Sequence, residues 1–130
     1  MITHCGVFAT TSNDIKDIIK GLELLQHRGQ EGCGISYINK KNEVVTFKCN
    51  GFVKDNFNNI NLIKSKHFIG HVRYSTSGSK NDNSLIQPLD IYNKNEKMTF
   101  AYNGNIPIKN SQMPDSKFIQ YYLQKNMSNN

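Results

Sequence analysis

The chain of 130 residues lacks any long apolar run, because charged or polar residues interrupt every hydrophobic stretch. A membrane-spanning helix needs about 20 mostly apolar residues, so we expect no membrane span and no membrane partner. The first residues also lack a basic region ahead of an apolar segment, so we expect no signal peptide. With 37% hydrophobic residues, the chain can form the core of one small domain or part of a larger one.

Cysteine is scarce and occurs at three positions, Cys5, Cys33 and Cys49. An odd number of cysteines without a secretory signal argues against a disulfide framework and indicates a reducing, cytoplasmic location. The spacing of histidine and cysteine matches no zinc pattern, so we expect no metal and no cofactor. Cys33 and Cys49 are expected to be packing residues, whereas Cys5 needs separate consideration.

Arginine is scarcer still, since 14 of the 16 basic residues are Lys and only Arg28 and Arg73 are Arg. The formal net charge of +6 is compatible with a nucleic-acid surface. However, the lysines are scattered among 18 asparagines, so we expect no nucleic-acid partner. The planar fork of arginine suits carboxylates, and the two arginines are therefore the positions to consider for binding them.

Short apolar segments separated by polar turns dominate the chain, and two segments have helical spacing. Residues 26–34 are polar and glycine-rich and predict a loop, and a short helix or loop is expected around 62–63. Residues 11–13 are the candidate N-caps of the first helix. Hairpin order with few helices predicts an α+β fold with antiparallel sheet. The predicted strands are 7–9, 35–38, 43–48, 68–74, 89–92 and 98–103, and the predicted helices are 15–25 and 115 onward, with a frayed tail from 124.

Cys5 lies at the start of the first predicted strand, directly before Gly6 and an apolar run. Taken alone, it is either a small buried cysteine or a nucleophile. A free thiol has a pKa of about 8.5 and needs a nearby base to form the reactive thiolate. If Cys5 were the first residue, its own α-amino group, with a pKa of about 8, would be able to take the thiol proton through a water molecule.

Six motifs occur in a fixed order along the chain: CGVFAT, LLQHRGQEGCGI, GFVKDNF, IGHVRYSTSG, QP and AYNGNI. Together they resemble the glutaminase domain of amidophosphoribosyltransferase, a class II glutamine amidotransferase whose nucleophile is an N-terminal cysteine. The resemblance runs from Cys5 to about Ile106 and more loosely to Leu123. It implies part of an αββα sandwich with antiparallel sheets, the fold of the N-terminal nucleophile (Ntn) hydrolases. The expected divisions are a leader at 1–4, a partial glutaminase domain at 5–124 and a tail at 125–130.

The resemblance also implies a reaction and the residues that perform it. Cys5 would attack the side-chain amide of L-glutamine and release ammonia, after which water hydrolyses the thioester to glutamate. Arg73 would clamp the α-carboxylate of glutamine, while the side chain of Asn103 and the backbone N–H of Gly104 would form the oxyanion hole. Asp115 either holds the substrate ammonium or caps the last helix, and the sequence leaves both interpretations open.

Further residues are assigned by the same resemblance. Tyr74 and Thr76 belong to a segment, 74–84, that is expected to close over glutamine and contact it. The residues expected to support the site are Arg28, Gly29 and His71.

The sequence also departs from the pattern it resembles. Residues 1–4 precede Cys5, so we expect them to be removed before the α-amino group can act. Tyr102 stands where histidine is usual in this family. No phosphate-binding loop is present in the sequence, so we expect a partner chain to carry the rest of the sandwich or the phosphoribosyltransferase domain. The resemblance implies a role in purine biosynthesis. The alternative is a non-catalytic module that binds glutamine or docks on and regulates a partner enzyme.

Overall fold

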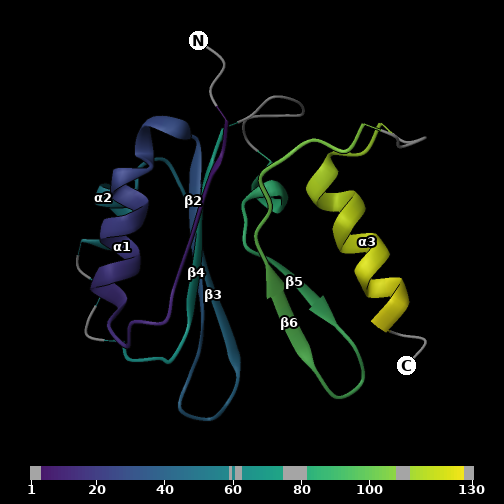
Figure 1. Ribbon diagram of the computed structural model, residues 1–130, viewed down its shortest axis with the longest axis horizontal. Coiled ribbons are helices and arrows are strands. Elements are labelled where there is room, and N and C mark those ends of the chain that lie inside the picture. Colours follow the sequence, from purple (N-terminus) through teal and green to yellow (C-terminus); the bar gives the residue numbers. More distant parts are fainter. Residues whose placement is uncertain (1–3, 59, 61–62, 75–81, 108–111, 128–130) are drawn as a thin grey trace.

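The computed structural model describes residues 4–58, 60, 63–74, 82–107 and 112–127. Its elements form four layers in Figure 1: helices α1 (Ile15–Leu24) and α2 (Val53–Phe57), a four-stranded sheet, a two-stranded sheet, and helix α3 (Asp115–Met127). The α+β fold class predicted from the sequence is confirmed. The order of the layers is the αββα order that the resemblance implied.

The larger sheet has the strand order β1-β4-β2-β3 and is antiparallel throughout. Its strands are β1 (Gly6–Thr10), β2 (Gly32–Ile38), β3 (Val44–Asn50) and β4 (Phe68–Arg73). Asn39 holds the turn between β2 and β3, because its Oδ1 accepts hydrogen bonds from the backbone of Lys41 and Glu43 at 2.9 Å each. Since β4 lies between β1 and β2, its last residue, Arg73, comes close to the chain that leads into both strands.

Helix α1 covers one face of this sheet with an apolar stripe at helical spacing. A Cβ added to Gly70 of β4 would lie 2.7 Å from Leu22 Cδ1, so the Leu22 side chain packs directly on the backbone of β4. This packing anchors β4, the strand that ends at the site described below. The buried cluster between the helices and the sheet consists of Ile15, Ile18, Leu22, Cys33, Ile35, Val53, Phe57, Phe68 and Val72.

The smaller sheet pairs β5 (Leu89–Tyr92) with β6 (Lys97–Phe100), and α3 packs on its outer side (Figure 1). Amide side chains attach the helix to β5. Gln120 Nε2 donates to the Asp90 carbonyl oxygen at 2.8 Å, and Tyr92 N donates to Gln124 Oε1 at 2.7 Å. In the part of α3 that the structure describes, only Ser116 is buried. Leu89 and Ile91 of β5, which point away from the larger sheet, are buried, so apolar contacts as well as these polar ones attach the layer.

Hydroxyl groups join the two facing sheets. Ser36 Oγ lies 2.7 Å from Thr46 Oγ1 and 3.1 Å from Thr99 Oγ1, and Thr46 Oγ1 donates to Asp90 Oδ1 at 3.0 Å. These contacts place β6 over β2 and β5 over β3. A Cβ added to Gly34 would collide with the Gln87 carbonyl oxygen, so the chain entering β5 also lies directly on β2.

The N-cap of the first helix differs from the sequence expectation. Asp14, and not one of residues 11–13, caps α1, because its Oδ1 accepts a hydrogen bond from Lys16 N at 2.9 Å. The predicted loop at 26–34 is also wrong at its end, since β2 already begins at Gly32. The glycines there pair with Arg73 and His71 of β4, and this pairing is invisible to local composition.

Two findings on helices go beyond the sequence expectations. The short helix Val53–Phe57 was not predicted; Ile63 is neither helix nor strand, which agrees with the loop alternative around 62–63, and residue 62 lies outside the described residues. Helix α3 continues to Met127, past the expected start of the frayed tail, because Gln124 still bonds to β5. No helix formed by the described residues is both long and apolar enough to cross a membrane.

Candidate active site

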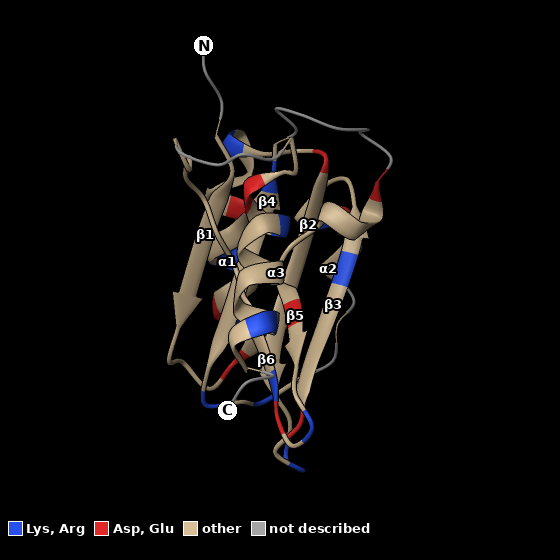
Figure 2. Cartoon of the chain, turned by 90° about the vertical axis from the view of Figure 1, so that its right-hand side faces the viewer, with Lys and Arg blue, Asp and Glu red and all other residues tan. Residues whose placement is uncertain are grey.

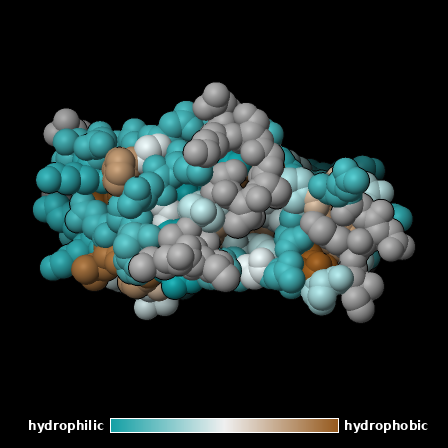
Figure 3. Space-filling view, turned by 90° about the horizontal axis from the view of Figure 1, so that it is seen from above, coloured by the Kyte–Doolittle hydropathy of each residue, from teal (hydrophilic) through white to brown (hydrophobic). Residues whose placement is uncertain are grey.

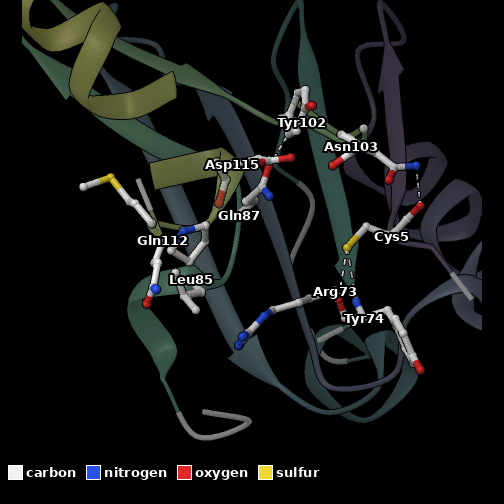
Figure 4. A pocket seen from close by; sticks show the side chains of 14 residues that line it. Cys5, Arg73, Tyr74, Leu85, Gln87, Tyr102, Asn103, Gln112 and Asp115 are labelled. Carbon is white, nitrogen blue, oxygen red and sulfur yellow. Dashed lines mark hydrogen bonds between the residues drawn. The ribbon is translucent and has the colours of Figure 1, made fainter. Parts of the chain in front are cut away.

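A pocket of about 390 Å³ lies where β4 ends and α3 begins (Figure 4). This volume is within the range of small-molecule binding sites. Figure 3, which views this end of the molecule from above, shows a mostly hydrophilic described surface. The lining residues come from four separate parts of the chain: Cys5; Arg73 and Tyr74; Leu85 and Gln87; and Tyr102, Asn103, Gly104, Asn105, Gln112, Met113, Pro114, Asp115 and Ser116.

The thiol of Cys5 faces the end of β4. Tyr74 N donates to Cys5 Sγ at 3.3 Å, and Sγ lies 3.4 Å from the Tyr74 carbonyl oxygen, to which the thiol can donate (Figure 4). Burial raises the pKa of the Cys5 thiol, the Glu31 carboxylate adds to the rise, and the Tyr74 backbone and the Arg73 charge oppose it. Because the net shift of the pKa is upward, the thiol needs a base to become a thiolate at neutral pH.

Two side chains hold the main chain of Cys5. Asn103 Nδ2 donates to the Cys5 carbonyl oxygen at 2.7 Å, and Arg28 Nε donates to the same oxygen at 3.1 Å. Arg28 ends the short helix η1 (Gln26–Arg28), while Asn103 follows β6, so two distant segments meet at the cysteine. The Asn103 amide carries two hydrogens, of which the bond to Cys5 uses one.

Arg73 is the one permanent cation among the described residues that line the pocket. Only 5% of its surface is exposed, and its Nη1 donates to the Asp82 carbonyl oxygen at 3.2 Å. A buried guanidinium needs compensating partners, and its planar fork can bind a carboxylate at two points. The pocket therefore contains, together with the thiol, a guanidinium whose chemistry suits a carboxylate (Figure 4).

Gly29 packs directly under the backbone that connects Arg73 to Tyr74. A Cβ added to Gly29 would lie 2.5 Å from the Arg73 carbonyl carbon and 2.8 Å from Tyr74 N. Gln26 holds this turn from both sides, because its Nε2 donates to the Gly29 carbonyl oxygen at 2.5 Å and its Oε1 accepts from Val53 N at 2.8 Å. The glycine is thus required where two backbones touch, next to the residue that contacts the thiol.

Asp115 begins α3, and its carboxylate points into the pocket (Figure 4). Its Oδ2 accepts a hydrogen bond from Ile106 N at 2.8 Å, which ties the segment after Asn103 to the helix. Asp115 is the first residue of α3 and lines the pocket. Both interpretations from the sequence, a helix cap and the binding of an ammonium group, stay predictions.

Gln87 is a site residue that sequence reasoning missed. It is 5% exposed, lines the pocket, and its Oε1 accepts a hydrogen bond from Tyr102 N at 2.6 Å. This bond fixes the backbone one residue before Asn103. A polar residue between Ile86 and Pro88, in an otherwise apolar segment, was the available signal.

His71 lies on β4 on the same face as Arg73, between the two sheets, and is fully buried. Burial lowers the pKa of His71 to about 4, with Arg73 acting in the same direction and the Tyr102 backbone opposing both. The ring is therefore neutral at physiological pH. His71 is not among the residues that line the pocket, which agrees with a supporting position.

The structure brings together most of the residues singled out from the sequence. One pocket is lined by Cys5, Arg73, Tyr74, Asn103, Gly104 and Asp115. Arg28 and Gly29 contact the backbone of these lining residues, Arg28 at Cys5 and Gly29 at Arg73 and Tyr74. Thr76 lies outside the described residues, as does most of the segment 74–84 that was expected to close over the substrate.

Comparison with known proteins agrees with these observations. No family model matches the chain. The amidophosphoribosyltransferase of Pyrococcus horikoshii is 41% identical over 109 residues, covering 82% of this chain and 23% of the relative. That of Methanothermobacter thermautotrophicus is 42% identical over 110 residues, covering 78% and 23%. The chain thus spans less than a quarter of the length of the curated relatives it matches.

Two solved structures share the fold. One, described as the allosteric regulatory enzyme of purine biosynthesis, superposes with a TM-score of 0.60 at 33% identity and covers 72% of this chain and 21% of the other. The second is the glutamine phosphoribosylpyrophosphate amidotransferase of Bacillus subtilis, with a TM-score of 0.54 at 31% identity, covering 74% and 20%.

The layered fold, with a cysteine ahead of its first strand, is that of an N-terminal nucleophile hydrolase. The chain is homologous to a part of amidophosphoribosyltransferase, and the resemblance to the glutaminase domain that its motifs predicted is confirmed.

Proposed function

We propose that this chain is a class II glutaminase, which hydrolyses glutamine to glutamate and ammonia through a thioester on Cys5. One observation carries the proposal: the pocket gathers a thiol, a buried arginine, a side-chain amide and a carboxylate from separate segments. The similarity to amidophosphoribosyltransferases supports this class of reaction.

The base in this mechanism is the α-amino group of Cys5 after residues 1–4 have been removed. Burial raises the pKa of the thiol, so an adjacent amine with a pKa of about 8 is well suited to take its proton at neutral pH. Cys5 Sγ then attacks the side-chain carbonyl carbon of glutamine. The carbon–nitrogen bond breaks while the protonated α-amino group gives its proton to the leaving nitrogen, which departs as ammonia, and water then hydrolyses the thioester to glutamate and the free thiol.

The negative charge that develops on the amide oxygen of glutamine during the attack needs hydrogen-bond donors close to Cys5. The second N–H of Asn103 and the backbone N–H of Gly104 supply them, because both residues line the pocket beside the thiol. Removal of one such donor typically costs about 3 kcal/mol of transition-state stabilisation. The bond from Gln87 to Tyr102 N holds this pair in place.

The ends of glutamine are matched by the two charged residues of the pocket. Arg73 takes the α-carboxylate with its guanidinium fork, and Asp115 takes the α-ammonium group. Holding both ends orients the side-chain amide toward the thiol, which is the contribution that proximity makes to catalysis.

Use of the ammonia requires further protein. The relatives are more than four times longer than the matched segment, so we propose that a partner polypeptide in the cytoplasm supplies the rest of the sandwich or the phosphoribosyltransferase domain. Glutamine itself is the small-molecule partner of this chain.

Glutamate release and intact mass, measured on the same sample, test the proposal. We expect activity only in protein that has lost residues 1–4, and none in Cys5→Ala. Arg73→Lys keeps the charge but loses the fork, so it should raise KM for glutamine more than it lowers kcat. Activity in protein that retains all four leading residues would contradict the role of the α-amino group.

A second function, glutamine binding without turnover, is favoured by one observation. In the chain as it stands, His4 acylates the nitrogen of Cys5, and the thiol has a raised pKa without a basic side chain hydrogen-bonded to it among the described residues. Calorimetric binding of glutamine by processed protein that releases no glutamate would favour this regulatory module over the enzyme.

A further inference from the structure

Tyr102 lines the pocket directly before Asn103, and its backbone is anchored in the interior of the molecule. Tyr102 N donates to Gln87 Oε1 at 2.6 Å, and Gln87 itself is only 5% exposed. The Tyr102 backbone also lies close enough to the buried His71 ring to oppose the lowering of its pKa by burial. The side chain of Tyr102 therefore starts from a well-fixed point of the fold.

The Tyr102 ring folds over Gly104, two residues further along the chain. A Cβ added to Gly104 would lie 2.7 Å from the Tyr102 hydroxyl oxygen, 3.0 Å from Cζ and 3.2 Å from Cε2. These atoms form the far end of the phenol, so a shorter side chain would not reach the same place. The ring thus packs directly on the backbone of Gly104.

Gly104 needs such a contact if its N–H is to act as an oxyanion donor. It lies in an exposed bend outside the helices and strands. Glycine has more conformational freedom than any other residue, whereas an oxyanion donor is effective because it is in position before the reaction. Its neighbours are fixed, Asn103 by a bond to Cys5 and Ile106 by a bond to the first residue of α3. The Tyr102 ring supplies the contact at Gly104 itself.

From this packing we propose that Tyr102 is a positioning residue for the oxyanion hole. Its ring holds the backbone of Gly104, so that the N–H stays directed toward the carbonyl group that Cys5 attacks. The two hydrogen bonds in Figure 4, from Tyr102 to Gln87 and from Asn103 to Cys5, fix the same segment on either side of the ring's attachment. The inference rests on the proposed glutaminase function, in which the Gly104 N–H is a donor.

Glutamate release by the chain that has lost residues 1–4 tests the role of Tyr102 in turnover. Tyr102→Ala removes the ring, and we expect kcat to fall about tenfold or more, because a small displacement of a catalytic group is costly. KM for glutamine should change less than about twofold, because in the proposed mechanism Arg73 and Asp115 bind the two ends of the substrate. Tyr102→Phe keeps the ring on Gly104 and should restore kcat to within about threefold of the parent.

The matched control is Tyr121→Ala, which removes the same side chain from an exposed position. Tyr121 is 61% exposed on α3, and this helix runs away from the pocket along the smaller sheet (Figure 2). The variant should leave both kcat and KM unchanged, and melting curves establish that all three variants are folded. An equal loss of kcat in Tyr121→Ala and Tyr102→Ala, or a rise in KM without a fall in kcat in Tyr102→Ala, overturns the proposal.

A second measurement does not depend on activity. The backbone order parameter of the Gly104 amide is recorded by nuclear magnetic resonance on the full chain without glutamine. We expect a rigid value of about 0.8 in the parent and a value below about 0.6 in Tyr102→Ala, with no change in Tyr121→Ala. An unchanged order parameter in Tyr102→Ala refutes the proposal whether or not the chain hydrolyses glutamine. A fall in order, with no glutamate released by the parent, supports the hold on Gly104 and contradicts the proposed function alone.

Discussion

The first two layers and the last two layers of the molecule are built differently. Between α1, α2 and the four-stranded sheet, apolar side chains form one buried cluster. Helix α3 buries only Ser116 among its described residues and leaves Tyr121 and Tyr122 about 60% exposed, at 61% and 59%. Burial of apolar surface stabilises the first pair of layers. In the second pair β5 buries Leu89 and Ile91, and α3 adds hydrogen bonds through Gln120 and Gln124.

The candidate site is formed by residues from both pairs of layers. Cys5, Arg28 and Arg73 come from the first two layers, and Asn103 and Asp115 come from the last two. The outer helix of the last two layers, α3, buries only Ser116 among its described residues. We expect exposed positions on α3 to tolerate mutation better than the core between α1 and the larger sheet.

The largest effect is expected from Leu22→Ala in the first core. Leu22 is fully buried against Gly70, so its truncation should lower the free energy of unfolding by about 3 kcal/mol through lost burial and a cavity. Tyr121→Ala on α3 should change it by less than about 0.5 kcal/mol. Urea unfolding of both variants measures the two losses, and a similar loss in both would contradict the exposed position of Tyr121 on α3.

An effect of similar size is expected from pH, through His71. Its pKa is lowered to about 4 in the folded chain from an ordinary value of 6.5, so the unfolded state binds the proton more readily between these values. Stability is complete above about pH 6.5 and falls toward pH 4, by about 3 kcal/mol at most. Unfolding measured from pH 7 to pH 4 checks this.

A His71→Phe variant supplies the control for that prediction. It removes the titrating ring while it keeps an aromatic side chain between the sheets. Its stability should fall less steeply over the same pH range. An unchanged slope would assign the pH dependence to other groups.

A smaller loss of stability is expected from removing the hydrogen bond by which Gln87 fixes the backbone at Tyr102, next to Asn103. Gln87→Leu leaves Tyr102 N without this acceptor, which should cost about 1–2 kcal/mol. Hydrogen exchange at the Tyr102 amide should accelerate. The rate of glutamate release should fall, because Asn103 follows Tyr102 directly and would be held less firmly. Gln112→Leu, at an exposed residue of the same pocket, is the matched control and should have no effect on that amide.

The smallest effect is expected at the hydroxyl contacts between the sheets. Ser36 Oγ and Thr99 Oγ1 lie 3.1 Å apart, and a double-mutant cycle of Ser36→Ala and Thr99→Val should give a coupling energy of about 1 kcal/mol. A coupling indistinguishable from zero would mean that the layers are held together elsewhere.

Local patterns in the sequence predicted most of the elements. The apolar spacing of Ile15, Ile18 and Leu22 indicated α1, and the hairpin β5–β6 followed from two apolar runs around an Asn-Lys turn. The beginning of β2 at Gly32 was missed, because glycine is a poor strand former by composition. It is a strand residue here because it pairs with Arg73.

The sequence by itself determined the periodicity of the helices and strands and the chemical identity of Cys5, Arg73 and Asn103. Only the tertiary structure decided that Asn103 and Arg28 meet on the carbonyl of Cys5, and that Gln87 holds Tyr102. Such contacts join segments far apart in the chain. They exist because the strands pair and the two sheets stack face to face, which depends on the packing of the whole molecule rather than on the local order of residues.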